Sequence, residues 1–180
     1  MIGKLFIVST PIGNLNDITY RAIETLKYVD IVLAEDTRHS KKLFSNFEIS
    51  TPLKAFHEHN EREKTESIIS ELNSGISVAL ISDAGTPLIS DPGYFLVSQA
   101  KKEGIEVVPI PGPSAIITAL SASGLASNSF SFFGFLPSKK IARIKYLQNK
   151  TALNETIIFY ESPKRILATL TDMLEVFGNE

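Results

Sequence analysis

The sequence predicts an α/β protein whose N-terminal part is an open, mostly parallel sheet. Short apolar runs alternate with stretches in which apolar residues recur at helical spacing, and five such units fit within the first 120 or so residues. Glycines follow several of the helical stretches, where helices commonly end. Alternation of this kind is typical of parallel strands joined by right-handed helical crossovers.

The predicted strands are the five apolar runs that are too short for helices. They lie at residues 5–9, 31–34, 53–56, 78–81 and 105–110. Between them we expect helices with recognisable caps. Asp17 is expected to cap the first helix, Ser40 the second and Asn60 the third, which Gly75 ends. Two further helices are expected at 94–102 and 114–123.

The pattern changes at a turn-rich stretch near residues 126–129, and we place a domain boundary within residues 112–128. We expect an N-terminal parallel α/β domain at 1–115 and the start of a second, smaller α/β domain at 116–180. The second part is expected to hold strands at 130–135 and 156–160 and helices at 139–149 and from Pro163 to Val176. Two strands are few for an independent core, so we expect this domain either to pack firmly on the first domain or to be incomplete.

Composition excludes several classes of protein. The chain has 180 residues, 43% of them hydrophobic, a net charge of −2 and no cysteine. Disulfides, zinc–thiolate sites and thiol nucleophiles are therefore excluded. No apolar stretch reaches the roughly 18–20 residues of a membrane span, and the first residues do not resemble a secretory signal. We expect a cytoplasmic protein.

Charge is distributed unevenly along the chain. Residues 138–165 contain seven basic and two acidic side chains, so this segment carries +5 and the rest carries −7. A local basic surface of this kind can contact phosphates, or it can be an ordinary solvated helix face.

A polar or glycine-rich loop follows each of the five predicted strands. In chain order the loops read TPIGN, EDTRH, HEHNE, SDAGTPLISDPG and PGPSA. The carboxyl ends of parallel strands share one edge of the sheet, and open α/β sheets bind ligands along that edge. The sequence therefore predicts one composite site.

The first two loops allow both a binding role and a simpler one. TPIGN holds a single glycine, Gly13, so it lacks the dinucleotide-binding fingerprint and can be a plain turn. In EDTRH, Glu35 and Asp36 can accept hydrogen bonds from hydroxyls and Arg38 can hold a phosphate or carboxylate. The alternative for EDTRH is an internal ion pair with a helix cap.

The other three loops differ in how strongly they indicate a ligand. In HEHNE, His57 and His59 can bind a metal, act in acid–base chemistry or serve at the surface. The long loop from Ser82 to Gly93 is rigid and rich in glycine and proline, which favours a binding loop. In PGPSA, Ser114 can cap a helix or contact a ligand.

Together these motifs resemble a known family. TPIGN, AEDTR, HNE, SDAGTP with SDPG, and PGPSA occur in the order and at the spacing found in the 16S ribosomal RNA cytidine 2′-O-ribose methyltransferase branch of the tetrapyrrole (corrin/porphyrin) methylase superfamily. FFGFLP and FYESPKR extend the resemblance into the second domain. It covers essentially the whole chain. Members of this branch are longer than 180 residues, so the resemblance implies a truncated chain.

The resemblance implies a fold, a donor and an acceptor. Two α/β domains would bind S-adenosylmethionine between them, without a metal, in a protein that is usually a homodimer. The acceptor would be a cytidine ribose of 16S ribosomal RNA in the small subunit. Phe133–Phe135 would approach the donor from the second domain. The residues implied in donor binding are Pro11, Ile12, Asp83, Thr86, Ile89, Ser114 and Ala115.

Methyl transfer from a sulfonium is an in-line displacement, so alignment of the reactants is the main requirement. A ribose hydroxyl also needs a group that accepts or orients its proton. We expect Asp36 or His59 in that role and Arg38 on a phosphate. RNA would contact the 139–145 helix and Lys164 with Arg165.

Three alternatives remain open at the level of sequence. One is a methylase of a tetrapyrrole or another small molecule that uses the same donor site. Another is a metal-dependent hydrolase or phosphotransferase that uses Asp36, His57, His59 and Asp83 as ligands. The last is an inactive RNA-binding fragment.

Overall fold

A computed structural model describes residues 2–178. The chain forms two compact units, Met1–Ala115 and Ile116–Glu180. The segment between β5 and β6 holds α5, Ala115–Ser123.

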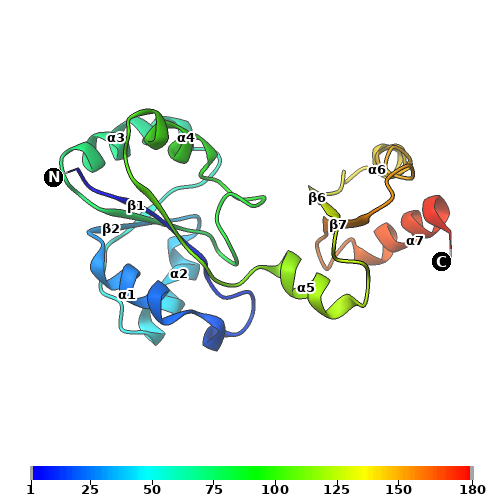
Figure 1. The fold of residues 1–180 in the computed structure, drawn as a ribbon, viewed down its shortest axis with the longest axis horizontal. Coiled ribbons are helices and arrows are strands. Elements are labelled where there is room, and N and C mark those ends of the chain that lie inside the picture. The colour runs from blue at the N-terminus through cyan, green and yellow to red at the C-terminus, as the bar shows by residue number, and fades with distance from the viewer. Residues whose placement is uncertain (1, 179–180) are drawn as a thin grey trace. The chain divides into compact units, whose positions relative to one another are not determined.

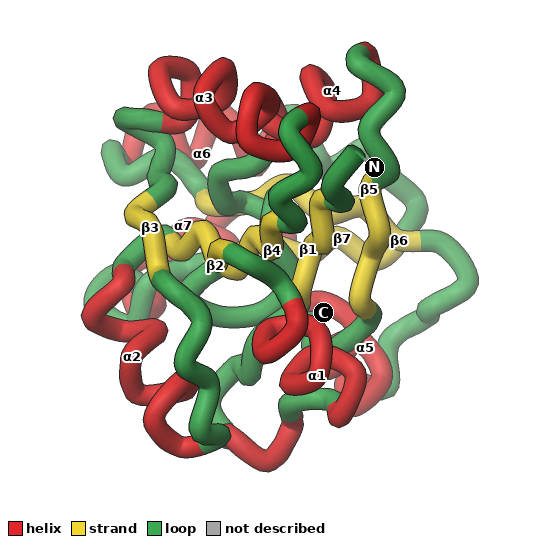
Figure 2. The backbone as a smooth tube through the Cα atoms, turned by 90° about the vertical axis from the view of Figure 1, so that its left-hand side faces the viewer, coloured by secondary structure: helices red, strands yellow, loops and turns green. Residues whose placement is uncertain are grey.

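The first unit is built on a five-stranded sheet in which every pairing is parallel. The strands lie in the order β3-β2-β4-β1-β5 (Figure 2). Their bounds are β1 Leu5–Val8, β2 Ile31–Ala34, β3 Leu53–Ala55, β4 Val78–Ile81 and β5 Val107–Ile110. The central strand β4 is buried along its whole length, as expected for a sheet covered on both faces. The predicted α/β class and parallel sheet are confirmed.

Two pairs of helices cover the two faces of this sheet. On one face lie α1 (Tyr20–Tyr28) and α2 (Thr37–Asn46), and on the other lie α3 (Glu61–Asn73) and α4 (Tyr94–Lys102) (Figures 1 and 2). Each face has its own core of buried side chains. Leu26 and Phe44 belong to the first core, Leu72 and Leu96 to the second. Burial of each such side chain contributes roughly 1.5–3 kcal/mol.

Two predicted helix caps are wrong. Asp17 lies in a short 3-10 turn, Leu15–Asp17, and Thr19 caps α1 instead, its hydroxyl accepting the N–H of Ala22 at 3.1 Å. Ser40 lies inside α2, which begins directly after β2 with Asp36 as its cap. A cap residue is typically extended, and its side chain accepts an N–H two or three residues on, as in Thr19 and Asp36. Asn60 stands at the N-cap of α3 as predicted, but its side chain makes no capping hydrogen bond.

The second unit contains a two-stranded parallel sheet and two helices beside α5. Strands β6 (Phe130–Phe135) and β7 (Thr156–Tyr160) pair in parallel, with a register shift between Phe132 and Phe135. The helices are α6 (Lys140–Gln148) and α7 (Ile166–Phe177). Pro163 precedes α7 and is not in its first turn, so that prediction started the helix too early.

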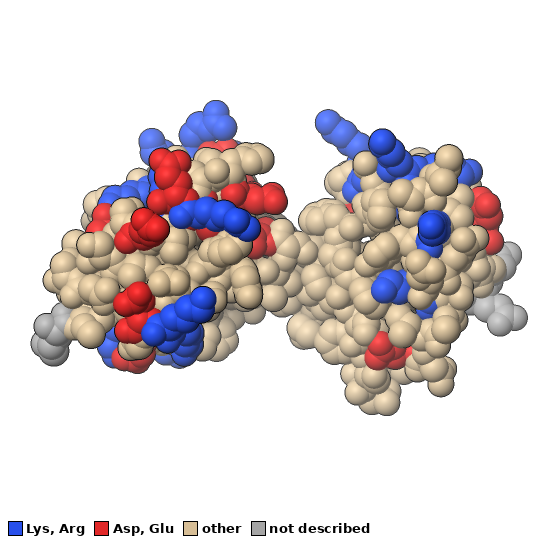
Figure 3. Space-filling model, turned by 90° about the horizontal axis from the view of Figure 1, so that it is seen from above, with Lys and Arg blue, Asp and Glu red and all other residues tan. Residues whose placement is uncertain are grey.

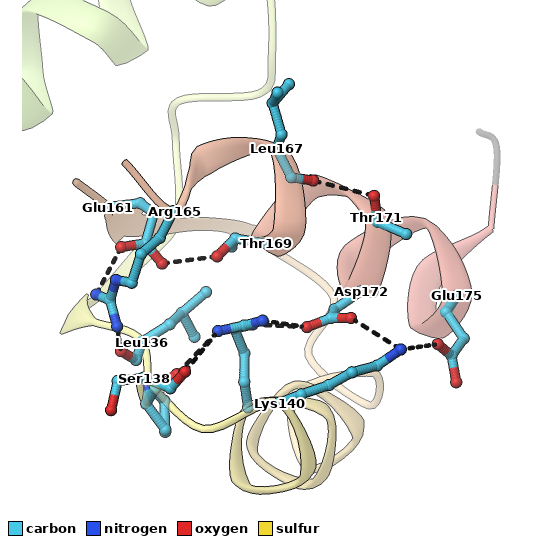
Figure 4. A network of polar contacts seen from close by, with 12 residues as sticks. Leu136, Ser138, Lys140, Glu161, Arg165, Leu167, Thr169, Thr171, Asp172 and Glu175 are labelled. Atoms are coloured by element: carbon cyan, nitrogen blue, oxygen red, sulfur yellow. Dashed lines mark hydrogen bonds and ion pairs between the residues drawn. The ribbon is translucent and has the colours of Figure 1, made fainter. Parts of the chain in front are cut away.

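Helices α6 and α7 are joined by a buried ion pair (Figure 4). The guanidinium of Arg143 binds Asp172 through Nε at 2.7 Å and Nη2 at 2.6 Å, and both side chains are at most 5% exposed. Nη1 of Arg143 also donates to the carbonyls of Pro137, at 3.3 Å, and Ser138, at 3.1 Å. The pair therefore fixes the turn between β6 and α6.

Within residues 2–178 we find no helix that is both long enough and apolar enough to cross a lipid bilayer.

Candidate functional site

The loops that follow β1, β4 and β5 are bonded to one another. Thr10 and Gly85 exchange two main-chain hydrogen bonds, at 2.9 and 3.0 Å. The hydroxyl of Thr86 lies 2.9 Å from the hydroxyl of Ser9 and donates to the carbonyl of Pro113 at 3.3 Å. TPIGN, SDAGTP and PGPSA thus form one continuous surface.

Two glycines allow these loops to approach closely. A Cβ added to Gly112 would lie 2.8 Å from Cβ of Ser9, closer than side-chain carbons approach one another. Gly85 has φ of +82°, and its added Cβ would lie 3.5 Å from Cγ2 of Ile12. The surface therefore exposes main chain at points where any larger residue would push the loops apart or strain the backbone.

The EDTRH loop after β2 joins this surface through Asp83. Oδ1 of Asp83 accepts the main-chain N–H of Asp36 at 3.2 Å. Asp83, which is implied in donor binding, therefore lies next to Asp36, which is expected to act on the acceptor.

Asp36 itself is engaged by Arg38. Nε and Nη2 of Arg38 donate to the two carboxylate oxygens of Asp36 at 3.2 and 3.0 Å. Hydrogen bonds from the Arg38 side chain and main chain lower the pKa of Asp36 to about 2. The ion pair and cap that were the simpler interpretation of this loop are both present, and they make Asp36 a weak base.

The HEHNE loop has a different arrangement from the one expected of a metal site. Asn60 accepts the main-chain N–H of His57 at 2.9 Å, while His59 is exposed with its ring centroid 6.0 Å from that of His57. Across residues 2–178, no cluster of three or more histidine, aspartate or glutamate side chains could hold a metal ion. Asp36, His57, His59 and Asp83, the ligands of the metal alternative, therefore form no such cluster among the described residues.

A cavity of about 260 Å³, which we call the α2 cavity, opens beside these loops. Its lining includes predicted residues, Pro11 and Asp83, and two that sequence reasoning did not select, His39 and Lys42. These two lie three residues apart on α2, so they share one helix face just after the carboxyl end of β2. That spacing is the signal that could have identified them.

A second cavity has an acidic lining. The cavity of about 320 Å³ is bordered by Glu35, Glu58 and Asp91 together with Tyr94 and Phe95. Burial, followed by the charges of Asp91 and other nearby acids, raises the pKa of Glu35. Burial likewise raises the pKa of Asp91.

The remaining residues implied in donor binding lie at the ends of two of these loops. Ile89 is 42% exposed and stands between Leu88 and Ser90, which have φ of +73° and +66°. Ser114 and Ala115 lie where the loop after β5 enters α5. Non-glycine residues at positive φ are sparsely populated and are concentrated at functional sites.

The basic residues of the second unit divide into internal and exposed groups. Arg143 is buried on Asp172, and Arg165 binds Glu161 at 2.5 Å and the carbonyl of Leu136 at 3.4 Å. Nζ of Lys150 lies 3.8 Å from the ring centroid of Phe133. The exposed group is Lys139, Lys140, Lys145 and Lys164. Within it, Nζ of Lys140 lies 3.7 Å from carboxylate oxygens of Asp172 and of Glu175. In Figure 3, basic side chains lie at several separate points on the face of this unit that is shown.

Comparisons with known proteins identify the family of this chain. The family model described as Tetrapyrrole (Corrin/Porphyrin) Methylases matches residues 4–180. A Vibrio cholerae protein named Ribosomal RNA small subunit methyltransferase I is 58% identical over 176 residues, covering 98% of this chain and 61% of that protein. A Pseudomonas aeruginosa protein of the same name is 58% identical over 178 residues, covering 99% of this chain and 63% of that protein. The chain thus spans less than two thirds of the length of these relatives.

Solved structures show the same fold at low identity. A cobalt precorrin-4 methyltransferase has a TM-score of 0.67 at 16% identity, covering 96% of this chain and 74% of its own. A uroporphyrin III C-methyltransferase from Thermus thermophilus has a TM-score of 0.65 at 16% identity, covering 99% and 78%. With a family model that matches nearly every residue, these findings show that the chain belongs to the tetrapyrrole (corrin/porphyrin) methylase family.

Proposed function

We propose that this chain is part of an S-adenosylmethionine-dependent methyltransferase that methylates the 2′-hydroxyl of a cytidine ribose in 16S ribosomal RNA. The observation that carries the proposal is the 58% identity, over 98% of the chain, to a protein named Ribosomal RNA small subunit methyltransferase I. The two solved structures described above are only 16% identical, so they support the fold and not the acceptor.

The joined loops suit the methyl donor. S-adenosylmethionine has an apolar body with a few polar groups, which calls for apolar walls and a small number of placed polar atoms. Pro11, Ile12 and Ile89 supply apolar surface, while Asp83 supplies a carboxylate. The donor brings the reactive methyl group. Ser114 and Ala115 would border the donor. Thr86 would act by holding the loops together, since its hydroxyl already contacts Ser9 and Pro113.

The chain's own groups must then align the ribose hydroxyl and manage its proton. Our candidates from the sequence are Asp36 and His59, with Arg38 near a phosphate. The low pKa of Asp36 favours orienting the hydroxyl over removing its proton. Arg38 is 88% exposed at its side chain, so its guanidinium can reach a phosphate while it pairs with Asp36.

RNA would be held by exposed lysines of the second unit, Lys139, Lys145 and Lys164. Ammonium–phosphate contacts release counterions, so RNA affinity should fall steeply as salt rises. We further propose that the protein works as a homodimer in the cytoplasm and that methylation requires no metal.

Two measurements test this function. Calorimetry with S-adenosylmethionine should show saturable binding, and Asp83→Ala should weaken it. Methyl transfer from labelled donor should occur to small-subunit RNA and not to a porphyrinoid precursor. Transfer to the porphyrinoid alone would establish the small-molecule alternative, and RNA binding without any transfer would establish the inactive fragment.

A further inference from the structure

The α2 cavity has two chemically different walls. Pro11 and Asp83, from the loops after β1 and β4, belong to the surface proposed for the methyl donor. His39 and Lys42 project from the first two turns of α2. A group held in this cavity would therefore touch the donor-binding loops on one side and an imidazole and an ammonium on the other.

The volume of the cavity limits what it can hold. Pockets for complete small ligands usually measure about 300–1,000 Å³, and the α2 cavity measures about 260 Å³. It suits one part of a larger ligand, such as a single ribose with its neighbouring phosphate. The rest of a polynucleotide would remain outside.

The lining offers the two groups that such a fragment requires. An imidazole is the side-chain type that gains and loses a proton near neutral pH. A lysine supplies a positive charge for a phosphate without the planar geometry of arginine. Asp36, by comparison, is held as a weak base by Arg38, and His59 does not line the cavity.

We propose that the α2 cavity is the acceptor subsite, in which His39 accepts the proton of the ribose 2′-hydroxyl and Lys42 binds the adjacent phosphate. This inference rests on the proposed ribose methyltransferase function and assigns its proton acceptor. The 2′-oxygen forms a bond to the methyl carbon as the carbon–sulfur bond breaks. The electron pair of that bond stays on sulfur, which becomes a neutral thioether, and the hydroxyl proton passes to a ring nitrogen of His39.

The first test is single-turnover methylation with saturating donor and RNA. His39→Gln and His39→Ala should slow the step by 10²- to 10⁴-fold, the usual contribution of a general base, while donor affinity measured by calorimetry stays within threefold. Added imidazole should restore part of the rate of His39→Ala, which a purely structural role does not predict. Rates of His39→Gln within threefold of the parent would overturn the assignment, as would a loss confined to Asp36→Asn or His59→Gln.

The second test needs no turnover. Diethyl pyrocarbonate modifies accessible imidazoles, and the modified histidines can be identified by mass spectrometry. An RNA oligonucleotide that carries the target cytidine should protect His39 more than His59. Equal protection, or stronger protection of His59, would contradict the placement of the acceptor.

The third test separates Lys42 from its neighbour. Lys42→Gln should weaken RNA binding and reduce the slope of log affinity against log salt by about one unit. Lys41→Gln is the matched control, because Lys41 is exposed on the same helix and does not line the cavity. Equal effects of the two substitutions would exclude a specific phosphate contact.

The outcomes distinguish the inference from the function on which it rests. A parent protein that fails to methylate RNA under any condition refutes the proposed function. A parent protein that methylates RNA, together with an unaffected His39→Gln variant, refutes only the role of His39.

Discussion

Glu61 holds the main chain of Gly93 and, two residues on, of Phe95. Its Oε1 accepts their N–H groups at 3.0 and 2.8 Å, and the side chain belongs to a residue only 6% exposed. The start of α3 is thereby fastened to the start of α4 and to the end of the 82–93 loop. This contact fixes the far end of a loop whose near end carries Asp83.

Glu61→Ala should destabilise the protein and weaken donor binding. Two N–H groups would lose their acceptor, at about 1–3 kcal/mol each where water cannot replace it, so we expect about 2–6 kcal/mol from urea unfolding. Glu61→Gln keeps an acceptor oxygen and should recover part of both effects. Donor affinity unchanged in Glu61→Ala would mean that the loop does not depend on this contact.

Gly112→Ala should separate the loops after β1 and β5. The new Cβ would lie 2.8 Å from Cβ of Ser9, so one loop must move. We expect at least a tenfold weaker affinity for S-adenosylmethionine by calorimetry. Gly104→Ala is the control for backbone strain without a close contact, since Gly104 has φ of +72° and nothing lies within 4 Å of its added Cβ. Similar losses of affinity in both variants would show that the loss does not come from the contact with Ser9.

Glu35→Gln should stabilise the protein at neutral pH and not in acid. Burial and neighbouring acids raise the pKa of Glu35 above its ordinary value of 4.5. The folded state therefore holds the proton more tightly, and stability falls as pH rises from 4.5 through the folded pKa. The advantage of Glu35→Gln should be absent below pH 4.5 and grow across that window. Urea unfolding at a series of pH values measures it, with the exposed Glu24→Gln as control.

Breaking the pair between Arg143 and Asp172 should be far more costly than breaking a surface pair. Asp172→Ala leaves the buried guanidinium of Arg143 without its carboxylate, which costs about 3–5 kcal/mol. Arg143→Ala leaves Asp172 with Lys140 at 3.7 Å and should cost somewhat less. The double variant Arg143→Met with Asp172→Leu should lose much less. Lys4→Ala breaks an exposed pair with Glu106 and should cost about 0–1 kcal/mol by the same thermal or urea measurement. A single variant as mild as Lys4→Ala would show that water enters the pair.

Most of the fold could be predicted because apolar periodicity and length distinguish strands from helices. Val78–Ile81, Tyr94–Lys102 and Thr156–Tyr160 agree residue for residue with the structure. The caps Asp17 and Ser40 were wrong because several residues that could serve as caps precede each helix. Only the backbone angles show which of them accepts the N–H. Strand order likewise depends on which long-range pairings form.

The sequence could predict that the candidate site lies at the carboxyl edge of the sheet, but not which residues contact one another there. Sequence alone placed TPIGN, SDAGTP and PGPSA at the ends of strands, and the structure joins them through Thr10, Gly85 and Thr86. The sequence could not reveal that Arg38 forms an ion pair with Asp36, nor that His39 lines a cavity. Both features depend on where α2 begins. The roles of these residues in methylation stay predictions.

The inward-facing guanidinium of Arg143 has a consequence for how this protein meets a polyanion. A count along residues 138–165 gives seven cations, yet Arg143 and Arg165 neutralise carboxylates and hold main-chain carbonyls of their own unit. Lys140 also pairs with carboxylates, and Lys150 lies over the ring of Phe133. Electrostatic attraction at the surface then rests chiefly on Lys139, Lys145 and Lys164. Three such contacts correspond to a logarithmic salt slope of about −2 to −3, whereas seven would give about −5 to −6. The ionic-strength response is thus set by burial as well as by composition.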